Sequence, residues 1–406
     1  MNRKIQHTPE GVRDIINDEC RRKLALEERI HQVFKSFGYR DIETPTFEFF
    51  DVFGARIGTT PSNELYKFFD RDGNTLVLRP DFTPSIARAA SRFYAESTEP
   101  IRLCYRGSTF INHSNYMGRL KENTQMGVEL IGDGSVYADA EIAAMAIRTL
   151  LAAGLDQFQI TLGNVDLFRA LSKEAGLDES DEAELLELIR NKNSFGAWKF
   201  LETMNVPDEI AAILEKLPTL TGGGEVIVKA KQLFKPLPDT EAVREAYSAL
   251  ERLEQVVELL KAYGLSGYIL IDLSLTSRFM YYTGIIFRGY TYGSGEAIIK
   301  GGRYNGLLSQ FGMDAPAVGF VSEISQIMNV IIRKGEEAGK ANGPVLVLGQ
   351  ESAAKEAITA VTRLRDEGED AVLKLLDEGQ EYEDDDYYCR QGYSKVIRPG
   401  KEEERS

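Results

Sequence analysis

The chain has 406 residues, of which 43% are hydrophobic and 27% charged, so it can form two or three domains with ordinary hydrophobic cores. Its formal net charge of −15 argues against a nucleic-acid-binding protein, because affinity for phosphates comes from lysine and arginine, although an acidic chain can still carry a local basic patch. The three cysteines, Cys20, Cys104 and Cys389, are far apart in the sequence, which argues against disulfides and a zinc site.

The N-terminal residues predict an extended start followed by an amphipathic helix. Residues 19–37 carry apolar side chains at helical spacing and end at Gly38. The next segment, DIETPTFEFF, is typical of a strand interrupted by Pro45, which suits a sheet edge or a subunit contact. The start MNRKIQHTPEG lacks the apolar run of a signal peptide, and no apolar stretch approaches the roughly 18 residues that span a membrane. We therefore expect a cytoplasmic protein without membrane contact.

Residues 65–153 alternate between strand and helix patterns. A hairpin is predicted over 65–79, with its turn at 71–74. Thr83 is predicted to cap a helix that has Pro84 at its first position, and a second helix is predicted over 138–153. On the strand QMGVELIG, Gln125 and Glu129 share one face because side chains alternate along a strand. That face is either a solvated surface or part of a binding site.

Residues 165–262 are rich in leucine, alanine, glutamate and lysine at helical spacing, which predicts a helical module. The run Gly222-Gly223-Gly224 predicts a break, and it lacks the lysine and hydroxyl residue of a phosphate-binding loop. A helical cap without chemistry of its own is the simplest interpretation of this module.

The segment from Tyr281 to Gly312 predicts strands at IIF and EAIIK, separated by glycine-rich turns. Tyr281, Tyr282 and Tyr304 are placed at strand ends. Such an arrangement either forms a polar floor for a small ligand or is an ordinary meander with glycines at its turns. After Gly343, the pattern VLVLG, a helix, AVLKLL and SKVIR predicts a small α/β unit. Its ten-residue acidic run at 377–386 predicts a solvated loop that repels phosphate.

Several of these segments resemble the motifs of histidyl-tRNA synthetases, which are class II aminoacyl-tRNA synthetases. The matching motifs, in chain order, are LRPDFT, the run at 102–132, YYTG and GGRYNGL. The resemblance implies an α+β fold, a class II antiparallel sheet flanked by helices, and a homodimer. It divides the chain into a core at 1–164 and 263–335, a helical insertion at 165–262, and a shortened anticodon-binding-like α/β domain at 343–400.

Three departures from that family bear on catalysis. Synthetases stabilise the negative charge of phosphoryl transfer with three arginines, whose positions here hold Ile111, Ser277 and Gln326. Arg278 lies one residue from the second position, but a shift of one residue along a strand turns a side chain to the other face. Loss of one such donor typically costs about 3 kcal/mol. We therefore expect no synthetase activity. The sequence shows no constellation of metal ligands, and we expect no metal and no cofactor.

The amino-acid pocket of the family is, by contrast, present in the sequence. The resemblance implies that Glu129 accepts a hydrogen bond from an imidazole, that Tyr282 binds its other nitrogen, and that Tyr281 and Tyr304 help to form the pocket. Asp81, which replaces the family's glutamate, would hold the α-amino group with Thr83 and Gln125. The implied histidine-binding residues are Asp81, Thr83, Arg119, Gln125, Glu129, Tyr281, Tyr282 and Tyr304.

A histidine pocket without the arginines that bind ATP is the pattern of the ATP phosphoribosyltransferase regulatory subunits, which the chain resembles more closely than any synthetase. That family implies a hetero-oligomer with a short catalytic subunit in the first step of histidine biosynthesis, with histidine as effector and no tRNA. Two alternatives remain from the sequence: a divergent histidyl-tRNA synthetase, and an RNA-binding module that kept the fold.

Overall fold

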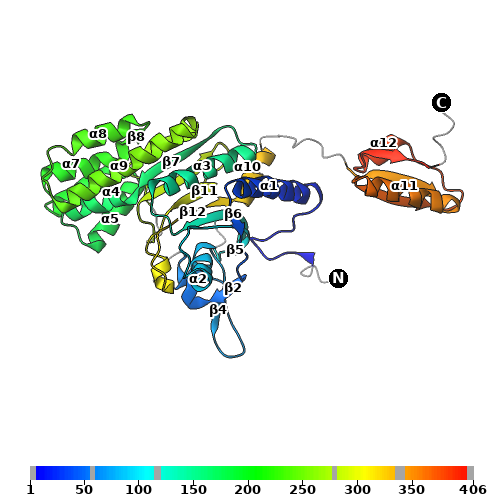
Figure 1. Ribbon diagram of the computed structural model, residues 1–406, viewed down its shortest axis with the longest axis horizontal. Helices are drawn as coiled ribbons and strands as arrows, with labels where there is room; N and C mark the ends of the chain where they lie inside the picture. The colour runs from blue at the N-terminus through cyan, green and yellow to red at the C-terminus, as the bar shows by residue number, and fades with distance from the viewer. Residues whose placement is uncertain (1–5, 55–59, 114–119, 277–280, 334–342, 400–406) are drawn as a thin grey trace. The chain divides into compact units, whose positions relative to one another are not determined.

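The computed structural model describes residues 6–54, 60–113, 120–276, 281–333 and 343–399 (Figure 1). The chain forms two compact units, Met1–Lys334 and Gly335–Ser406. Within the described ranges, no helix is both long and apolar enough to cross a membrane.

The larger unit is built on a nine-stranded sheet in the order β1-β5-β6-β12-β11-β10-β7-β9-β8. Neighbours are antiparallel from β5 to β7 and at β9–β8, and parallel at β1–β5 and β7–β9. The strands are β1 (Arg40–Asp41), β5 (Ile101–Phe110), β6 (Glu122–Ile131), β7 (Phe158–Asn164), β8 (Thr221–Gly222), β9 (Ile269–Asp272), β10 (Ile285–Thr291), β11 (Ile299–Arg303) and β12 (Ala317–Glu323). The predicted antiparallel sheet is confirmed.

Helices α1, α3 and α10 lie along one face of this sheet (Figure 1). The inward side chains of β6, Met126, Val128 and Leu130, pack there in one hydrophobic cluster with Leu26, Ile30 and Phe34 of α1, which are all buried. The helices of the unit are α1 (Asn17–Ser36), α2 (Thr83–Phe93), α3 (Val136–Ala152), α4 (Val165–Glu174), α5 (Glu179–Arg190), α6 (Ser194–Thr203), α7 (Asp208–Lys216), α8 (Glu225–Leu233), α9 (Glu241–Ala262) and α10 (Ile324–Arg333). The amphipathic helix predicted over 19–37 is α1.

The predicted helical module contains α4 to α9, which gather beside β7, β9 and β8 (Figure 1). Its buried side chains belong to the same hydrophobic cluster as the central sheet. The predicted break at Gly222 to Gly224 is also a strand end, since β8 pairs with β9 before α8 begins at Glu225. The module thus adds an edge strand to the sheet as well as helices.

A second, antiparallel sheet contains β2 (Phe47–Phe49), β4 (Thr75–Leu78) and β3 (Lys67–Phe69), in that order. The β3–β4 pair is the hairpin predicted over 65–79. Short 3₁₀ helices in the two units are η2 (Phe50–Phe53), η3 (Ser62–Glu64), η5 (Leu217–Thr219), η6 (Ser266–Tyr268), η7 (Leu308–Phe311) and η8 (Glu351–Ala353).

Two local predictions were wrong. Thr83 is the first residue of α2 and not its cap, which is Phe82, and the Thr83 hydroxyl donates instead to Glu129. The strand predicted at EAIIK begins at Ile299 and runs on to Arg303. It passes through Gly301 and Gly302 because β10 and β12 pair with it on both sides.

The smaller unit has a three-stranded parallel sheet in the order β14-β13-β15. Its elements are β13 (Val345–Gln350), α11 (Ala354–Asp366), β14 (Ala371–Leu376), α12 (Asp385–Arg390) and β15 (Lys395–Ile397), which confirms the predicted α/β pattern. The acidic run is a loop only up to Asp384, whose side chain caps α12. Asp385 and Asp386 open that helix, where the helix dipole favours negative charge.

Candidate functional site

The face of the large sheet opposite the helical layer carries the predicted site. Glu129 of β6 pairs with Gly319 of β12, which in turn pairs with Gly302 of β11. A Cβ atom at Gly319 would lie 1.8 Å from the Glu129 Oε2, and one at Gly302 would lie 2.9 Å from the Tyr282 ring. Glycine at these two positions therefore leaves the space that the Glu129 and Tyr282 side chains occupy.

Glu129 is a buried carboxyl group at the centre of this face, with a side chain only 1% exposed. The Thr83 hydroxyl donates to its Oε1 at 2.8 Å, and the Tyr304 hydroxyl donates to its Oε2 at 2.5 Å. Burial raises the pKa of Glu129 to about 8, although the two donors act in the opposite direction. A buried, oriented carboxyl group of this kind suits a ligand that offers an N–H donor.

Three tyrosines surround this carboxyl group. The ring of Tyr281 lies 4.8 Å from the ring of Tyr282 and 5.9 Å, edge to face, from that of Tyr304. Burial raises the pKa of all three phenols, so their hydroxyl groups stay protonated and can donate hydrogen bonds. Together they place aromatic rings with polar ends beside the Glu129 carboxyl group, a combination that small-ligand sites commonly have.

Asp81 lies just before α2 and is partly exposed. The backbone N–H of Thr83 donates to its Oδ1 at 3.3 Å. Desolvation raises the pKa of Asp81 to about 6, and the carboxylate of Glu323 adds to this effect while Lys300 opposes it. Glu323 is therefore close enough to act on Asp81, and the two carboxyl groups are both acceptors for a cationic donor.

Gln125, the other predicted residue on β6, is 8% exposed and pairs across the sheet with Glu323 of β12. Its Nε2 donates to both oxygens of Glu323, each at 3.3 Å. The Lys300 ammonium lies 3.2 Å from the Glu323 Oε1. Sequence reasoning missed Glu323 and Lys300. The signal for Glu323 was its spacing of four residues from Gly319, which puts both on one strand face.

A cavity of about 340 Å³ reaches this group of side chains. Ile111 and Gln326, at two of the three positions where synthetases carry arginine, both line it. The Gln326 amide donates to Glu296 at 3.3 Å and accepts from Ser294 at 3.2 Å. Arg119, Ser277 and Arg278, which were also singled out from the family motifs, lie outside the described residues.

Comparison with known proteins gives consistent results. The family model for histidyl-tRNA synthetase matches residues 11–327. The ATP phosphoribosyltransferase regulatory subunit of Acetivibrio thermocellus is 39% identical over 362 residues, which cover 89% of this chain and 85% of that protein.

The chain belongs to the family of ATP phosphoribosyltransferase regulatory subunits.

The solved structures agree with this family. A structure from Bacillus halodurans C described as an ATP phosphoribosyltransferase regulatory subunit/histidyl-tRNA synthetase aligns with a TM-score of 0.85 and 31% identity, covering 97% of this chain and 98% of that one. Histidyl-tRNA synthetase from Nostoc sp. PCC 7120 aligns with a TM-score of 0.79 at 21% identity, which shows the shared fold alone, over 95% of this chain and 88% of that one. The family and the class II fold predicted from the sequence motifs are confirmed.

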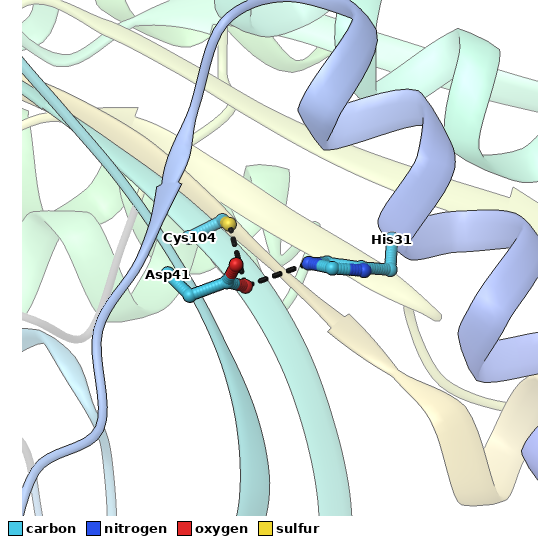
Figure 2. Close-up of side chains that lie close together, drawn as sticks. All are labelled: His31, Asp41 and Cys104. Carbon is cyan, nitrogen blue, oxygen red and sulfur yellow. Dashed lines mark hydrogen bonds and ion pairs between the residues drawn. The ribbon is translucent and has the colours of Figure 1, made fainter.

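The fold also brings together three potential metal ligands that the sequence did not predict to be neighbours. His31 of α1, Asp41 of β1 and Cys104 of β5 have donor atoms within 4.8 Å of one another (Figure 2). The Asp41 Oδ1 lies between the other two, 2.6 Å from the His31 Nε2 and 3.5 Å from the Cys104 Sγ.

The surroundings of these three side chains favour a group of hydrogen bonds over a metal site. The Lys35 ammonium lies 3.5 Å from the Asp41 Oδ2, where it would repel a cation. Burial, reinforced by Asp41, raises the pKa of the Cys104 thiol to about 12, so the sulfur stays protonated and donates to the carboxylate. The contacts join α1, β1 and β5 at the edge of the large sheet.

Proposed function

We propose that this chain is a non-catalytic regulatory subunit of ATP phosphoribosyltransferase. In this role it is required for the activity of a separate, short catalytic subunit in the first step of histidine biosynthesis, and it mediates feedback inhibition by histidine. The observation that carries the proposal is the identity with regulatory subunits along almost the whole chain.

The pocket around Glu129 supports histidine as the effector. An imidazole can donate one N–H to the carboxyl group of Glu129, and the Tyr282 side chain, whose ring packs against that of Tyr281, would contact the other ring nitrogen. Because Glu129 is buried, a ligand that cannot donate to it leaves its acceptor capacity unused. This requirement selects for an imidazole over an apolar side chain.

The cavity beside the pocket supports the absence of ATP chemistry. Ile111 cannot hold a phosphate, and the Gln326 amide already has partners on both of its polar atoms. Among the described lining residues, Lys300 is the one lysine or arginine, and it forms a salt bridge with Glu323. Phosphoryl transfer needs several preorganised positive charges, and the described residues around this cavity do not supply them, which supports a non-catalytic role.

An exposed aromatic surface supports a homodimer through the class II core. Phe47 and Phe49 of β2 are 51% and 57% exposed, and Phe68 of β3, which the strand register places on the same face, is 36% exposed. The Phe47 ring contacts the Phe68 ring edge to face, so these side chains form one apolar patch on the small sheet. A contiguous exposed apolar patch marks an interaction surface. We assign it to the second copy of the chain and leave other surfaces for the catalytic subunit.

The test is a reconstitution assay. The chain is mixed with a short catalytic subunit, and formation of phosphoribosyl-ATP from ATP and phosphoribosyl pyrophosphate is measured with and without histidine. The proposal predicts strong stimulation that histidine reverses, and a complete lack of stimulation refutes it. Histidine-dependent exchange of pyrophosphate into ATP, measured in parallel, is expected at background level. Exchange well above background would instead support a divergent synthetase.

A further inference from the structure

Glu323 is a buried carboxylate that none of the family motifs assigns to the site. It ends β12 and is 8% exposed. Side chains alternate along a strand, so Glu323 shares the face of Gly319, which pairs with Glu129 in the pocket. Across the sheet, Glu323 pairs with Gln125. The carboxylate is therefore built into the floor of the predicted ligand site.

The contacts of Glu323 fix the orientation of the Gln125 amide. An ionised carboxylate only accepts hydrogen bonds, so an amide facing it must present its NH₂ group. Both Glu323 oxygens lie 3.3 Å from the Gln125 Nε2, and the Lys300 ammonium is 3.2 Å from the Glu323 Oε1. The Lys300 ammonium thus pairs with the same carboxylate that receives the Gln125 NH₂ group.

This orientation leaves the other end of the amide without a partner. The Gln125 Oε1 is buried and has no hydrogen-bond partner among the described residues. Buried polar oxygens are nearly always paired in folded proteins, and an unpaired one indicates a missing partner. Gln125 also lines the cavity of about 340 Å³ that opens beside the pocket. The missing partner is therefore a hydrogen-bond donor that enters this cavity.

The charges around Gln125 identify the chemical class of that donor. Asp81 and Glu323 are both acceptors, and Glu323 is close enough to raise the pKa of Asp81. Lys300 compensates one of these two negative charges, which leaves the group with an excess of negative charge and a free amide oxygen. A primary ammonium, with three donors and one positive charge, satisfies both requirements.

We propose that Glu323, held by Lys300, is a positioning residue that turns the Gln125 oxygen toward the α-ammonium group of the bound amino acid. This assignment rests on the proposed function and specifies it further: it names the residue that orients the Gln125 acceptor for the ammonium group of the ligand. Without Glu323 the Gln125 amide can rotate, and the acceptor for the ammonium is lost.

The test measures the binding of three ligands by calorimetry to the full chain and to the Glu323→Ala and Glu323→Gln variants. Histidine and histamine carry an ammonium group, whereas imidazolepropionate does not. We expect Glu323→Ala to weaken histidine and histamine by roughly tenfold to hundredfold, the value of a hydrogen bond to a charged group. Imidazolepropionate should change less than threefold or so. Glu323→Gln keeps an acceptor for the Gln125 NH₂ and should restore most of the histidine affinity.

Controls separate this inference from the proposed function. Glu122→Ala changes an exposed glutamate at the start of the same strand as Gln125 and should leave all three affinities unchanged. Glu129→Ala should weaken all three ligands, because each contains an imidazole. The role of Glu323 is refuted if both Glu323 variants bind histidine as tightly as the unmodified chain does. It is also refuted if Glu323→Ala weakens the binding of imidazolepropionate as much as that of histidine. In either case the proposed histidine site itself is not refuted. If the unmodified chain binds no histidine, both ideas fail.

Discussion

Replacing Glu129 with glutamine should raise the free energy of unfolding of the larger unit, and the gain should increase with pH. Glutamine has nearly the same shape as glutamate and can keep hydrogen bonds with Thr83 and Tyr304, which hold the carboxyl group at 2.8 and 2.5 Å. It carries no charge at any pH. The variant therefore removes the unfavourable ionisation of a carboxyl group in a buried site while leaving its packing in place.

The sign and size of the effect follow from the pKa of Glu129. The pKa is about 8 in the folded chain against an ordinary value of 4.5, so the folded state binds the proton more tightly. The resulting stabilisation is complete below pH 4.5 and is lost as the pH rises toward 8. At about 1.4 kcal/mol for each unit of pKa, the loss between pH 5 and pH 8 is about 3 kcal/mol. The glutamine variant should not show this loss.

The assay is denaturant unfolding at pH 5 and pH 8, followed by the fluorescence of Trp198. This is the one tryptophan in the chain, and it lies on α6 of the larger unit, so the signal reports that unit alone. Glu122→Gln, an exposed change on the same strand, controls for the general loss of a carboxylate. The difference between the variant and the unmodified chain should grow by about 3 kcal/mol from pH 5 to pH 8. A difference that stays constant within about 0.5 kcal/mol would refute the burial argument.

Three further changes test other parts of the structure. Gly319→Ala places a methyl group 1.8 Å from the Glu129 Oε2. It should lower the free energy of unfolding by about 3 kcal/mol in thermal unfolding and abolish histidine binding. Histidine affinity within twofold or so of that of the unmodified chain would contradict the proposed site geometry. Phe49→Ser removes a side chain that is 57% exposed, so light scattering should show a folded monomer, and an unchanged dimer would place the interface elsewhere. The buried Cys104 has a thiol pKa of about 12, so it should react with iodoacetamide at least roughly a hundredfold more slowly at neutral pH than the exposed Cys389. Equal rates would contradict the hydrogen bond between Cys104 and Asp41.

Features that depend on one strand or helix could be predicted from the sequence. The alternation of β6 placed Gln125 and Glu129 on one face, and the structure has both on the pocket side while Val128 packs in the core. Apolar spacing likewise predicted α1 and its buried face. The family motifs supplied what periodicity could not, namely the order in which these elements join one sheet.

Features that depend on contacts between distant segments were missed. Thr83 has the side chain of a helix cap, but the Glu129 carboxyl group, 46 residues away, takes its hydroxyl hydrogen bond instead. The Lys300–Glu323 pair requires the register of β11 against β12, which no local pattern specifies. Buried polar side chains on a sheet pair with the groups that lie nearest in space, so local sequence propensity cannot predict these pairs.

The most direct test of the account is histidine inhibition of the reconstituted complex with Glu129→Ala in place of the unmodified chain. The account predicts that the variant still stimulates phosphoribosyl-ATP formation by the catalytic subunit, because Glu129 is buried in the ligand pocket and away from the surface. Inhibition by histidine should be lost or shifted to at least roughly tenfold higher concentration. Unchanged inhibition in a variant that still stimulates would contradict the claim that histidine acts through this pocket.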